Sequence, residues 1–302
     1  MRNILGIILL ACVTTVASAQ QVPLTSQYMF NNYLLNPAEA GSVDYMPFTL
    51  SARVQWAGIE GAPKTQFFST HSKITKEMGL GGFVYRDETG PISEQGIQLS
   101  YAYHLSLSRK EKISFGLAGQ WFFYNIDQNY LNPYSGGDAA LNSLQASANS
   151  LDFNLGVLYY TDKYKVGIST PQLLQNSLYN SLTDNYSPEL KRHYYLYGEF
   201  QQEINNEVDI VPSTLLKYVA GSPVQFDVNV KALYLKKYWA GISYRYNNAM
   251  VAMVGLSWED WSFGYSFDYS LNNINDYTVG AHEIFLTYNL VNKQRFSRKR
   301  YR

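Results

Sequence analysis

The stretch "IQLSYAYHL", residues 97–105, alternates between large apolar or aromatic side chains and small or polar ones. Successive side chains of a β-strand point to opposite faces, so this stretch predicts a strand with one apolar and one polar face. The same alternation runs through "FTLSARVQW" (48–56) and "ISFGLAGQW" (113–121), and helical spacing fits none of the three. An apolar face therefore recurs on strands that lie far apart in the sequence.

Clear and weaker alternating segments together predict fourteen strands. They cover 48–56, 65–74, 79–87, 97–105, 113–121, 151–159, 164–170, 191–200, 209–219, 224–234, 238–245, 249–258, 261–269 and 284–290. Every long connection follows an odd-numbered strand, notably 124–149 and 171–190, as the long extracellular loops of outer-membrane barrels do. The pattern predicts an all-β fold, a transmembrane antiparallel β-barrel over 48–290. A soluble β-sandwich or soluble barrel is the alternative.

The composition agrees with a membrane barrel. The chain has 302 residues, 27 of them Tyr, and only 16% are charged, against about 25% in typical soluble domains. Its 24 basic and 24 acidic residues leave no bulk charge for binding nucleic acid. No run of roughly 18 apolar residues follows the N-terminal leader, so no transmembrane helix is predicted.

Both ends carry segments that do not belong to the barrel. Residues 1–19 predict a secretory signal peptide, with Arg2 before an apolar run and an A-x-A cleavage signal that ends at Ala19. Lipoprotein processing at Cys12, after "LLA", is the alternative. Cys12 is the only cysteine, so cleavage after Ala19 leaves no disulfide or thiol chemistry. Residues 291–302 predict a basic periplasmic tail, either solubilising or an arm that docks on an acidic partner or peptidoglycan.

All five tryptophans fall at or near the ends of predicted strands. Trp56 and Trp121 lie at the outer side, and Trp239, Trp258 and Trp261 lie at the inner side. Aromatic side chains gather at both membrane interfaces of outer-membrane barrels. All five are therefore predicted to belong to the two aromatic girdles.

The polar face carries charges of both signs, which argues against a simple anion or cation pore. Closure of the barrel makes the first and last strands neighbours. Arg53 and Glu283 are then expected to face inward side by side, with Asp268 one strand further. We predict an ion pair across this seam; the alternative is that each group is separately hydrated in a wet lumen.

The usual catalytic motifs do not occur in the sequence, which has no G-x-S-x-G, H-E-x-x-H, P-loop or spaced Cys/His set. The four histidines lie on or near different predicted strands without an obvious Ser or Asp partner; they are His71, His104, His193 and His282. The loop 124–149 lacks the spacing of a calcium loop. We therefore expect no enzymatic activity, no cofactor and no metal site.

Seven segments in chain order span essentially the whole mature sequence. They are "SQYMFNNYLLNPAEAGS" (26–42), "RVQWAGIEGAPKTQFFSTHS" (53–72), "GLGGFVYRDETGPIS" (79–93), "GISTPQLL" (167–174), "WAGISYR" (239–245), "GYSFDYS" (264–270) and "GAHEIFLTYNL" (280–290). Together they resemble the PorP/SprF family of type IX secretion system membrane proteins from Bacteroidetes. The resemblance implies a barrel in outer-membrane lipid, related to the FadL-like transporters.

The resemblance also implies partners. Family members work beside surface proteins exported by the type IX system, often giant adhesins with a type B C-terminal signal domain. Other members belong to the secretion machinery and touch its periplasmic ring subunits. The expected function is to anchor, present or assist secretion of such a surface protein through the extracellular loops and barrel mouth. The alternatives are a structural component of the machinery and a FadL-like channel for hydrophobic small molecules.

The turn "WAGIEGAPKT", 56–65, is predicted to form a tight lip at the outer rim that contacts the partner. The candidate contact residues are Trp56, Gly58, Gly61, Pro63 and Thr65. The alternative is a loop that simply needs turn residues. The connections 124–149 and 171–190 are expected to determine which partner is held.

Residues 20–47 precede the first strand, and their "YLLNPAEAG" (33–41) has turn chemistry that a loose leader does not need. Asn36 can cap a turn, Pro37 fixes its backbone, and the small residues after it allow close packing. A related Asn-Pro-Ala element occurs in the hatch of FadL-like barrels. The segment is therefore predicted to plug the lumen. Its plug residues are Tyr28, Tyr33, Asn36, Pro37, Ala38 and Gly41, with Met29, Phe30 and Leu34 also facing the wall.

Overall fold

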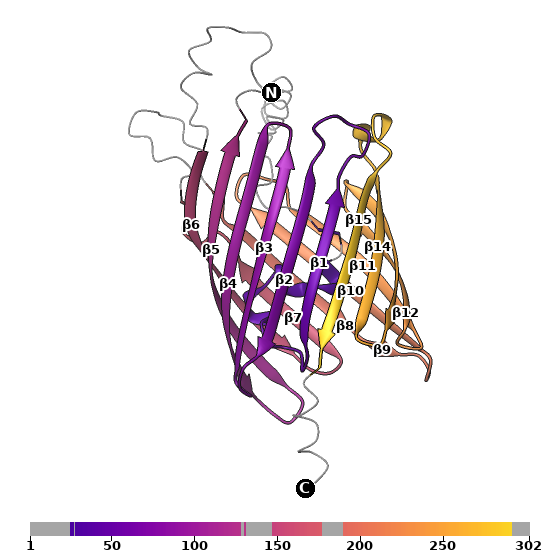
Figure 1. Cartoon of the computed structure of the whole chain (residues 1–302). Coiled ribbons are helices and arrows are strands. Elements are labelled where there is room, and N and C mark those ends of the chain that lie inside the picture. Colours follow the sequence, from indigo (N-terminus) through magenta and orange to yellow (C-terminus); the bar gives the residue numbers. More distant parts are fainter. Residues whose placement is uncertain (1–24, 27, 128–129, 131–146, 177–189, 292–302) are drawn as a thin grey trace, which may run out of the picture.

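The computed structural model describes residues 25–26, 28–127, 130, 147–176 and 190–291, which form one antiparallel sheet closed into a barrel (Figure 1). Strands adjacent in sequence are adjacent in the sheet, and pairing of β1 with β15 and of β10 with β11 closes the circle. The strands are β1 (Met46–Val54), β2 (Lys64–Lys73), β3 (Met78–Thr89), β4 (Ile92–Ser106), β5 (Lys112–Ile126), β6 (Ser147–Tyr160), β7 (Tyr164–Thr170), β8 (His193–Phe200), β9 (Gln202–Glu203), β10 (Val208–Val219), β11 (Gln225–Tyr234), β12 (Tyr238–Arg245), β13 (Ala249–Trp258), β14 (Trp261–Ser270) and β15 (Ala281–Leu290).

The two-residue strand β9 continues β8. Against β10 the two keep one register, since Glu199 lies opposite Ser213 and Glu203 lies opposite Asp209. The hydrogen bonding to β10 is interrupted between β8 and β9, where Pro212 of β10 has no N–H to donate. The fifteen strands of the described chain therefore amount to fourteen that build the wall, and the prediction of a fourteen-stranded antiparallel barrel is confirmed.

The two ends of the barrel differ in their connections. At the end where β1 begins, the connections are short: 74–77, 107–111, 161–163, 204–207, 235–237 and 259–260. The long ones lie at the opposite end: 55–63, 127–146, 171–192 and 271–280. We call this opposite end the outer mouth, because long loops of outer-membrane barrels are extracellular. The predicted signal peptide, the residues beyond Val291 and parts of the two longest connections lie outside the described residues.

Side-chain alternation separates a lipid face from a lumen face. On β4, Leu99 is 72% exposed whereas its neighbour Gln98 is 2% exposed. The outward row of this strand is apolar and aromatic, and the inward row contains Ser100 and His104, both buried. A band of exposed apolar side chains around the barrel would be unfavourable in water and suits the hydrocarbon core of a bilayer.

The girdle prediction is wrong for one tryptophan. Trp239 is only 6% exposed because it shares the inward phase of β12 with Arg245. Its ring stacks on Phe285 with centroids 5.8 Å apart, and it fills the space beside Gly255 and Gly264 on the next strands. Trp121, Trp258 and Trp261, in contrast, are exposed. The orientation of Trp239 thus follows from strand parity, that is, from whether its position along the strand is odd or even, and not from its nearness to a strand end.

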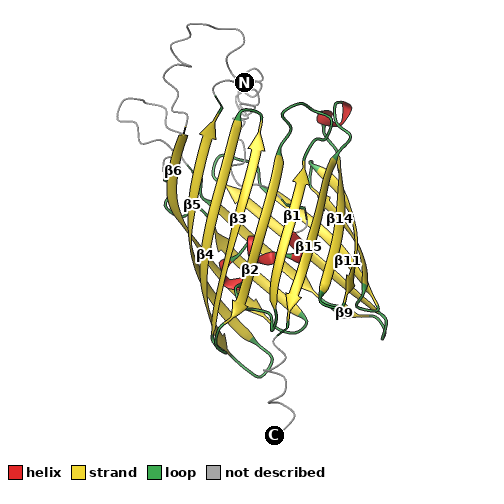
Figure 2. Cartoon of the chain, viewed as in Figure 1, coloured by secondary structure: helices red, strands yellow, loops and turns green. Residues whose placement is uncertain are grey.

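Helical structure in the described residues is confined to single turns of 3₁₀-helix. Three of them, η1 (Tyr28–Phe30), η2 (Asn32–Leu34) and η3 (Pro37–Glu39), lie inside the barrel (Figure 2). The fourth, η4 (Asn273–Asp276), lies in the connection between β14 and β15. No helix of the described chain is long and apolar enough to cross a membrane. β1 begins at Met46, two residues before the predicted start of the barrel.

Candidate functional site

The N-terminal segment, residues 25–26 and 28–45, lies against the lumen face of the wall. Asn36 organises its last turn, because its side-chain oxygen accepts a hydrogen bond from the Ala38 nitrogen at 2.9 Å while Pro37 occupies the first helical position. The Asn36 amide nitrogen donates to the carbonyl oxygens of Val157 at 3.1 Å and Ile168 at 3.2 Å. One side chain therefore both caps the turn and fastens it to β6 and β7.

The backbone of this turn approaches the wall at glycines. A Cβ placed on Gly116 of β5 would lie 2.2 Å from the Ala38 nitrogen, and one on Gly156 of β6 would lie 1.9 Å from Asn36 Oδ1. A Cβ on Gly79 of β3 would likewise lie 1.9 Å from the Ala40 carbonyl oxygen. Any larger residue at these three wall positions would collide with the segment, so the wall is shaped to receive it.

Glu39 ties the segment to β7 and β8. Its buried carboxylate accepts hydrogen bonds from Tyr197 Oη at 2.9 Å and Ser42 Oγ at 2.8 Å, and Lys165 Nζ lies 3.3 Å away. Two histidines hold the next residues: His71 Nδ1 accepts from the nitrogen of Gly41 at 3.1 Å, and His104 Nε2 lies 2.8 Å from the carbonyl oxygen of Ala40. Glu39 was not among the residues predicted from the sequence to form the plug.

The aromatic residues of the segment make polar and apolar contacts with the wall. Tyr28 Oη donates to Asp227 at 3.1 Å, and burial together with the Asp227 carboxylate raises the pKa of Tyr28, so the hydroxyl keeps its proton. Tyr33 Oη donates to Ser100 Oγ at 2.9 Å. The Phe30 ring packs on Trp239 with centroids 4.0 Å apart. The structure thus places both predicted plug tyrosines against the wall.

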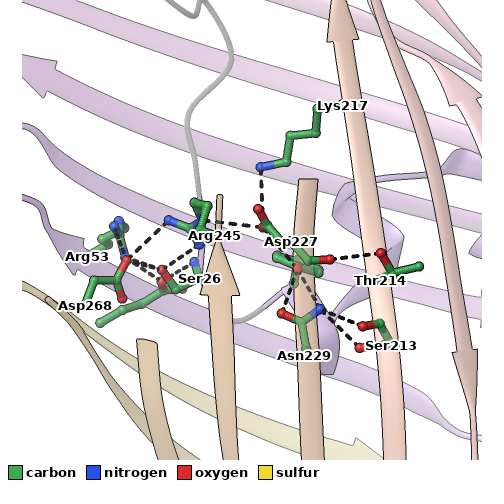
Figure 3. A network of polar contacts seen from close by, with 11 residues as sticks. Ser26, Arg53, Ser213, Thr214, Lys217, Asp227, Asn229, Arg245 and Asp268 are labelled. Carbon is green, nitrogen blue, oxygen red and sulfur yellow. Dashed lines mark hydrogen bonds and ion pairs between the residues drawn. The ribbon is translucent and has the colours of Figure 1, made fainter. Parts of the chain in front are cut away.

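The three charged residues predicted at the seam lie together: Arg53 is next to Asp268 (Figure 3) and pairs with Glu283. Arg53 on β1 is directly opposite Glu283 on β15, and its guanidinium nitrogens lie 3.3 Å from Glu283 Oε2 and 2.8 Å from Asp268 Oδ2. All three side chains are at most 5% exposed. Ser26 of the N-terminal segment joins them, since its nitrogen donates to Glu283 at 2.7 Å and its hydroxyl donates to Asp268 at 2.6 Å.

The charged network continues from Asp268 on β14 through Arg245 on β12 and Asp227 on β11 to Lys217 on β10 (Figure 3). Arg245 lies 3.4 Å from both Asp268 and Asp227, and Lys217 Nζ lies 4.0 Å from Asp227. Three cationic and three anionic side chains are therefore combined in one buried cluster, so no net charge remains to select an ion. The sequence predicts three of these six charges at the seam, Arg53, Asp268 and Glu283. It does not predict the pairing of Arg245 with Asp227, because that depends on the β11–β12 register.

The predicted lip residues divide into two groups. Gly58 and Gly61 are exposed turn residues with φ of +97° and +71°, conformations that favour glycine, and Trp56 and Pro63 are half-buried. Thr65 lies differently, because it belongs to the inward row of β2, is 5% exposed and donates a hydrogen bond to Asp87. The structure therefore places four of the five candidates at the rim surface and Thr65 inside the barrel.

Hydrogen bonds join the rim turns into a continuous structure that we call the lip: residues 55–63, Gly90–Pro91 and 271–280. The Ala57 nitrogen donates to the Gly280 carbonyl oxygen at 2.8 Å, and the Val279 nitrogen donates back to Ala57 at 2.9 Å. On the other side the Gly90 nitrogen donates to Gly61 at 2.8 Å. Backbone bonds of this kind hold neighbouring loops in fixed relative positions.

The described residues show no group of three or more His, Cys, Asp and Glu side chains arranged to hold a metal ion. The absence of enzymatic activity and of a cofactor stays a prediction. The site can therefore be described by what it contacts: a stable lip at the outer mouth, and beneath it a lumen that contains a hydrogen-bonded segment of the same chain.

The chain is similar to several solved structures over most of its length. The CymD monoaromatic hydrocarbon channel is 14% identical with a TM-score of 0.50, and the match covers 89% of this chain and 94% of that one. A TodX deletion mutant, described as a monoaromatic hydrocarbon channel, is 11% identical with a TM-score of 0.50 over 88% and 94%. A FadL homologue from Pseudomonas aeruginosa is 11% identical, with a TM-score of 0.49 over 89% and 95%. At these identities the likeness to the CymD and TodX structures shows the fold alone.

No curated protein matches the sequence. A family match, in contrast, covers residues 17–288, which is nearly the whole chain and includes the N-terminal segment, every strand of the wall and the lip. The resemblance seen in the seven sequence segments is confirmed by this match, and the antiparallel barrel agrees with it. The chain belongs to the family of type IX secretion system membrane proteins PorP/SprF and is an outer-membrane β-barrel.

Proposed function

We propose that this barrel anchors or presents a type IX-secreted surface protein, such as an adhesin with a type B C-terminal domain, at its outer mouth. The observation that carries the proposal is the lip, which is held by backbone hydrogen bonds and exposes apolar side chains. Tyr277 is 76% exposed and Val279 is 68% exposed, and both lie in the outer connection between β14 and β15. Unlike the wall residues, they stand beyond the strands, where lipid does not cover them, and this is typical of a protein contact.

Replacing both side chains by Ser is expected to release the partner. In a Tyr277→Ser/Val279→Ser variant the lip backbone is unchanged but its apolar contact is lost, and such contacts commonly dominate an interface. We expect at least about a tenfold drop in the amount of surface protein that stays with the cells, since a loss of about 1.4 kcal/mol is tenfold in affinity. Surface labelling of whole cells and assay of the medium measure this distribution.

The matched control is Val224→Ser/Tyr246→Ser. These side chains are 50% and 47% exposed in other outer connections, outside the lip as defined above. Retention of the surface protein should be unaffected by this control. Equal losses in both variants, with barrel levels unchanged, would contradict the assignment of the lip as the contact surface.

We further propose that the N-terminal segment closes the lumen to free passage. Two sets of contacts support this proposal. The segment packs against Gly79 of β3, Gly116 of β5 and Gly156 of β6, and Ser26 donates a hydrogen bond to Glu283 at the seam between β1 and β15. A channel for hydrophobic molecules, like the monoaromatic hydrocarbon channels CymD and TodX, is the alternative. The lumen face of this chain argues against it, because buried charged residues such as Arg53, Asp227 and Arg245 would line the path.

A role in the secretion machinery itself, through contact with periplasmic ring subunits, is the remaining alternative. The basic tail that would make this contact lies outside the described residues. Affinity purification from solubilised outer membranes separates the two roles. Recovery of a secreted C-terminal domain supports the anchoring role, and recovery of ring subunits alone contradicts it.

A further inference from the structure

The outer half of the lumen holds a chamber above the N-terminal segment. Its cavity volume is about 60 Å³, enough for a side chain rather than a long segment, and Leu35, Asn36 and Pro37 contribute to its lining. Its walls are mainly apolar and aromatic, formed by Phe67, Phe83, Tyr85, Phe122 and Tyr195. A concave apolar site with a few fixed polar groups is the usual form of a binding site.

Gln172 is one of those polar groups, and four hydrogen bonds fix the backbone that presents it. After β7 the chain turns inward: the Gln172 nitrogen donates to Asn154 Oδ1 at 3.0 Å, and the Leu173 nitrogen donates to the Phe153 carbonyl oxygen at 2.9 Å. The nitrogens of the next two residues donate to the two carboxylate oxygens of Asp152 at 2.8 and 3.1 Å. This turn contains the "PQLL" of the segment 167–174, and its bonds to β6 hold it at the chamber wall.

The Gln172 side chain has no hydrogen-bond partner among the described residues. It is 1% exposed, and neither Oε1 nor Nε2 is bonded. Its backbone has φ of +57°, which is uncommon for a residue other than glycine. Buried polar groups are nearly always bonded, and local strain persists where the surroundings enforce it, often at functional sites. The protein thus holds an unpaired amide in a strained position facing an apolar chamber.

We propose that the chamber binds a peptide segment of a partner protein that enters from the outer mouth. A glutamine amide offers one acceptor oxygen and an N–H donor side by side, which is the complement of a backbone peptide group. The neighbouring aromatic rings provide a surface for an apolar side chain of that segment. Lys217 at the chamber wall lies close to Asp227, so the site does not require an anionic ligand.

A hydrocarbon would fit the rings but would leave the Gln172 amide unpaired, so the geometry favours a ligand that carries an amide. This inference rests on the proposed anchoring of a secreted partner and names the part of the partner that the lumen receives. The lip would then supply the outer contact and the chamber would supply an inner one.

Binding of a capped peptide to the purified barrel tests the site. The probe is N-acetyl-glycyl-phenylalanyl-glycinamide, titrated against the mature chain in lipid nanodiscs and followed by saturation-transfer NMR. We expect it to bind, and to bind about tenfold more weakly to Gln172→Leu, because each lost hydrogen bond removes roughly this much. An analogue with one peptide N–H replaced by an ester oxygen should lose a similar factor.

Gln175→Leu is the matched control. Gln175 lies in the same turn, has the same φ of +57°, is exposed and is not part of the chamber wall. This variant should bind the peptide as the natural protein does. Heat-dependent mobility on SDS gels checks that both variants form barrels.

Three results would overturn the inference: no binding of the capped peptide, equal binding by Gln172→Leu, or binding of toluene or N-acetylglucosamine in preference to the peptide. The effect of the lip variant is measured separately, as the amount of surface protein that whole cells retain. If peptide binding depends on Gln172 while the lip variant retains its surface protein, the chamber stands and the lip assignment fails. If the lip variant loses its surface protein while peptide binding does not depend on Gln172, the lip assignment stands and only the proposed peptide site is rejected.

Discussion

Gly116→Val is expected to drive the N-terminal segment off the barrel wall. The new Cβ would lie 2.2 Å from the Ala38 nitrogen and 2.4 Å from the Pro37 carbonyl carbon. These are backbone atoms, so a side-chain rotation cannot relieve the collision and the whole turn must move. Overpacking costs typically about 1–3 kcal/mol even where side chains can adjust, and we expect the upper end here.

Hydrogen–deuterium exchange of residues 38–42 measures the displacement. In the natural protein these amides are bonded: the Gly41 nitrogen donates to His71 and the Ser42 nitrogen donates to the carbonyl oxygen of Glu39. A cost of about 3 kcal/mol raises the population of the displaced segment, and thus the exchange rate, on the order of 100-fold. If the segment closes the lumen, the same variant should also show larger conductance in planar bilayers.

Gly119→Val is the matched control on the same strand. A Cβ there would meet only a carbon of the Phe153 ring, at 3.8 Å, which is an ordinary contact. Exchange and conductance should stay at the natural values. Unchanged exchange in Gly116→Val would show that the segment is not seated as described, and faster exchange without a gain in conductance would contradict its role as a plug.

The sequence predicts most of the barrel, because the physics of its wall is local. A wall with lipid on one side and a polar lumen on the other imposes a two-residue period on every strand. The ion pair at the seam follows from barrel closure and strand parity. Closure makes the first and last strands neighbours, and parity turns the Arg53 and Glu283 side chains toward the lumen. The register then places these two residues directly opposite each other.

Contacts between the N-terminal segment and the wall could not be predicted in this way. Glu39 reads as an ordinary residue of a turn, and its partners Lys165 and Tyr197 are more than a hundred residues away. No period or spacing signals which wall glycines face the segment, since that depends on how deep it lies. Gln172 shows the same limit, because its importance comes from a bond that its side chain does not make.

Two assignments near strand ends show where a rule based on sequence position is too coarse. Its place near a strand end predicts that Trp239 belongs to the inner girdle, although it has the same parity as Arg245 and faces inward with it. The end of the segment 56–65 predicts that Thr65 belongs to the lip, yet β2 begins at Lys64 and places Thr65 on the lumen face. In both cases strand parity gives the observed orientation.

Arg53→Met is expected to destabilise the barrel by about 3–5 kcal/mol, the usual cost of removing one partner of a buried ion pair. Met has a similar length, so packing is largely preserved, but Glu283 and Asp268, at 1% and 3% exposure, lose the guanidinium between them. The segment is affected as well, since Ser26 contacts the same three side chains. Urea titration of the barrel in lipid vesicles, read by mobility on SDS gels, measures the free energy of unfolding.

Two further variants separate charge from packing. Arg86→Met removes an arginine that is 54% exposed and pairs with Glu88 on the outer surface, and it should cost less than about 1 kcal/mol. Adding Glu283→Gln to Arg53→Met should recover part of the lost stability, because it removes a buried charge that has lost its partner. If the double variant is instead as unstable as the sum of both single ones, the seam is held by packing and hydrogen bonds, and the charge pairing of Arg53 with Glu283 contributes little.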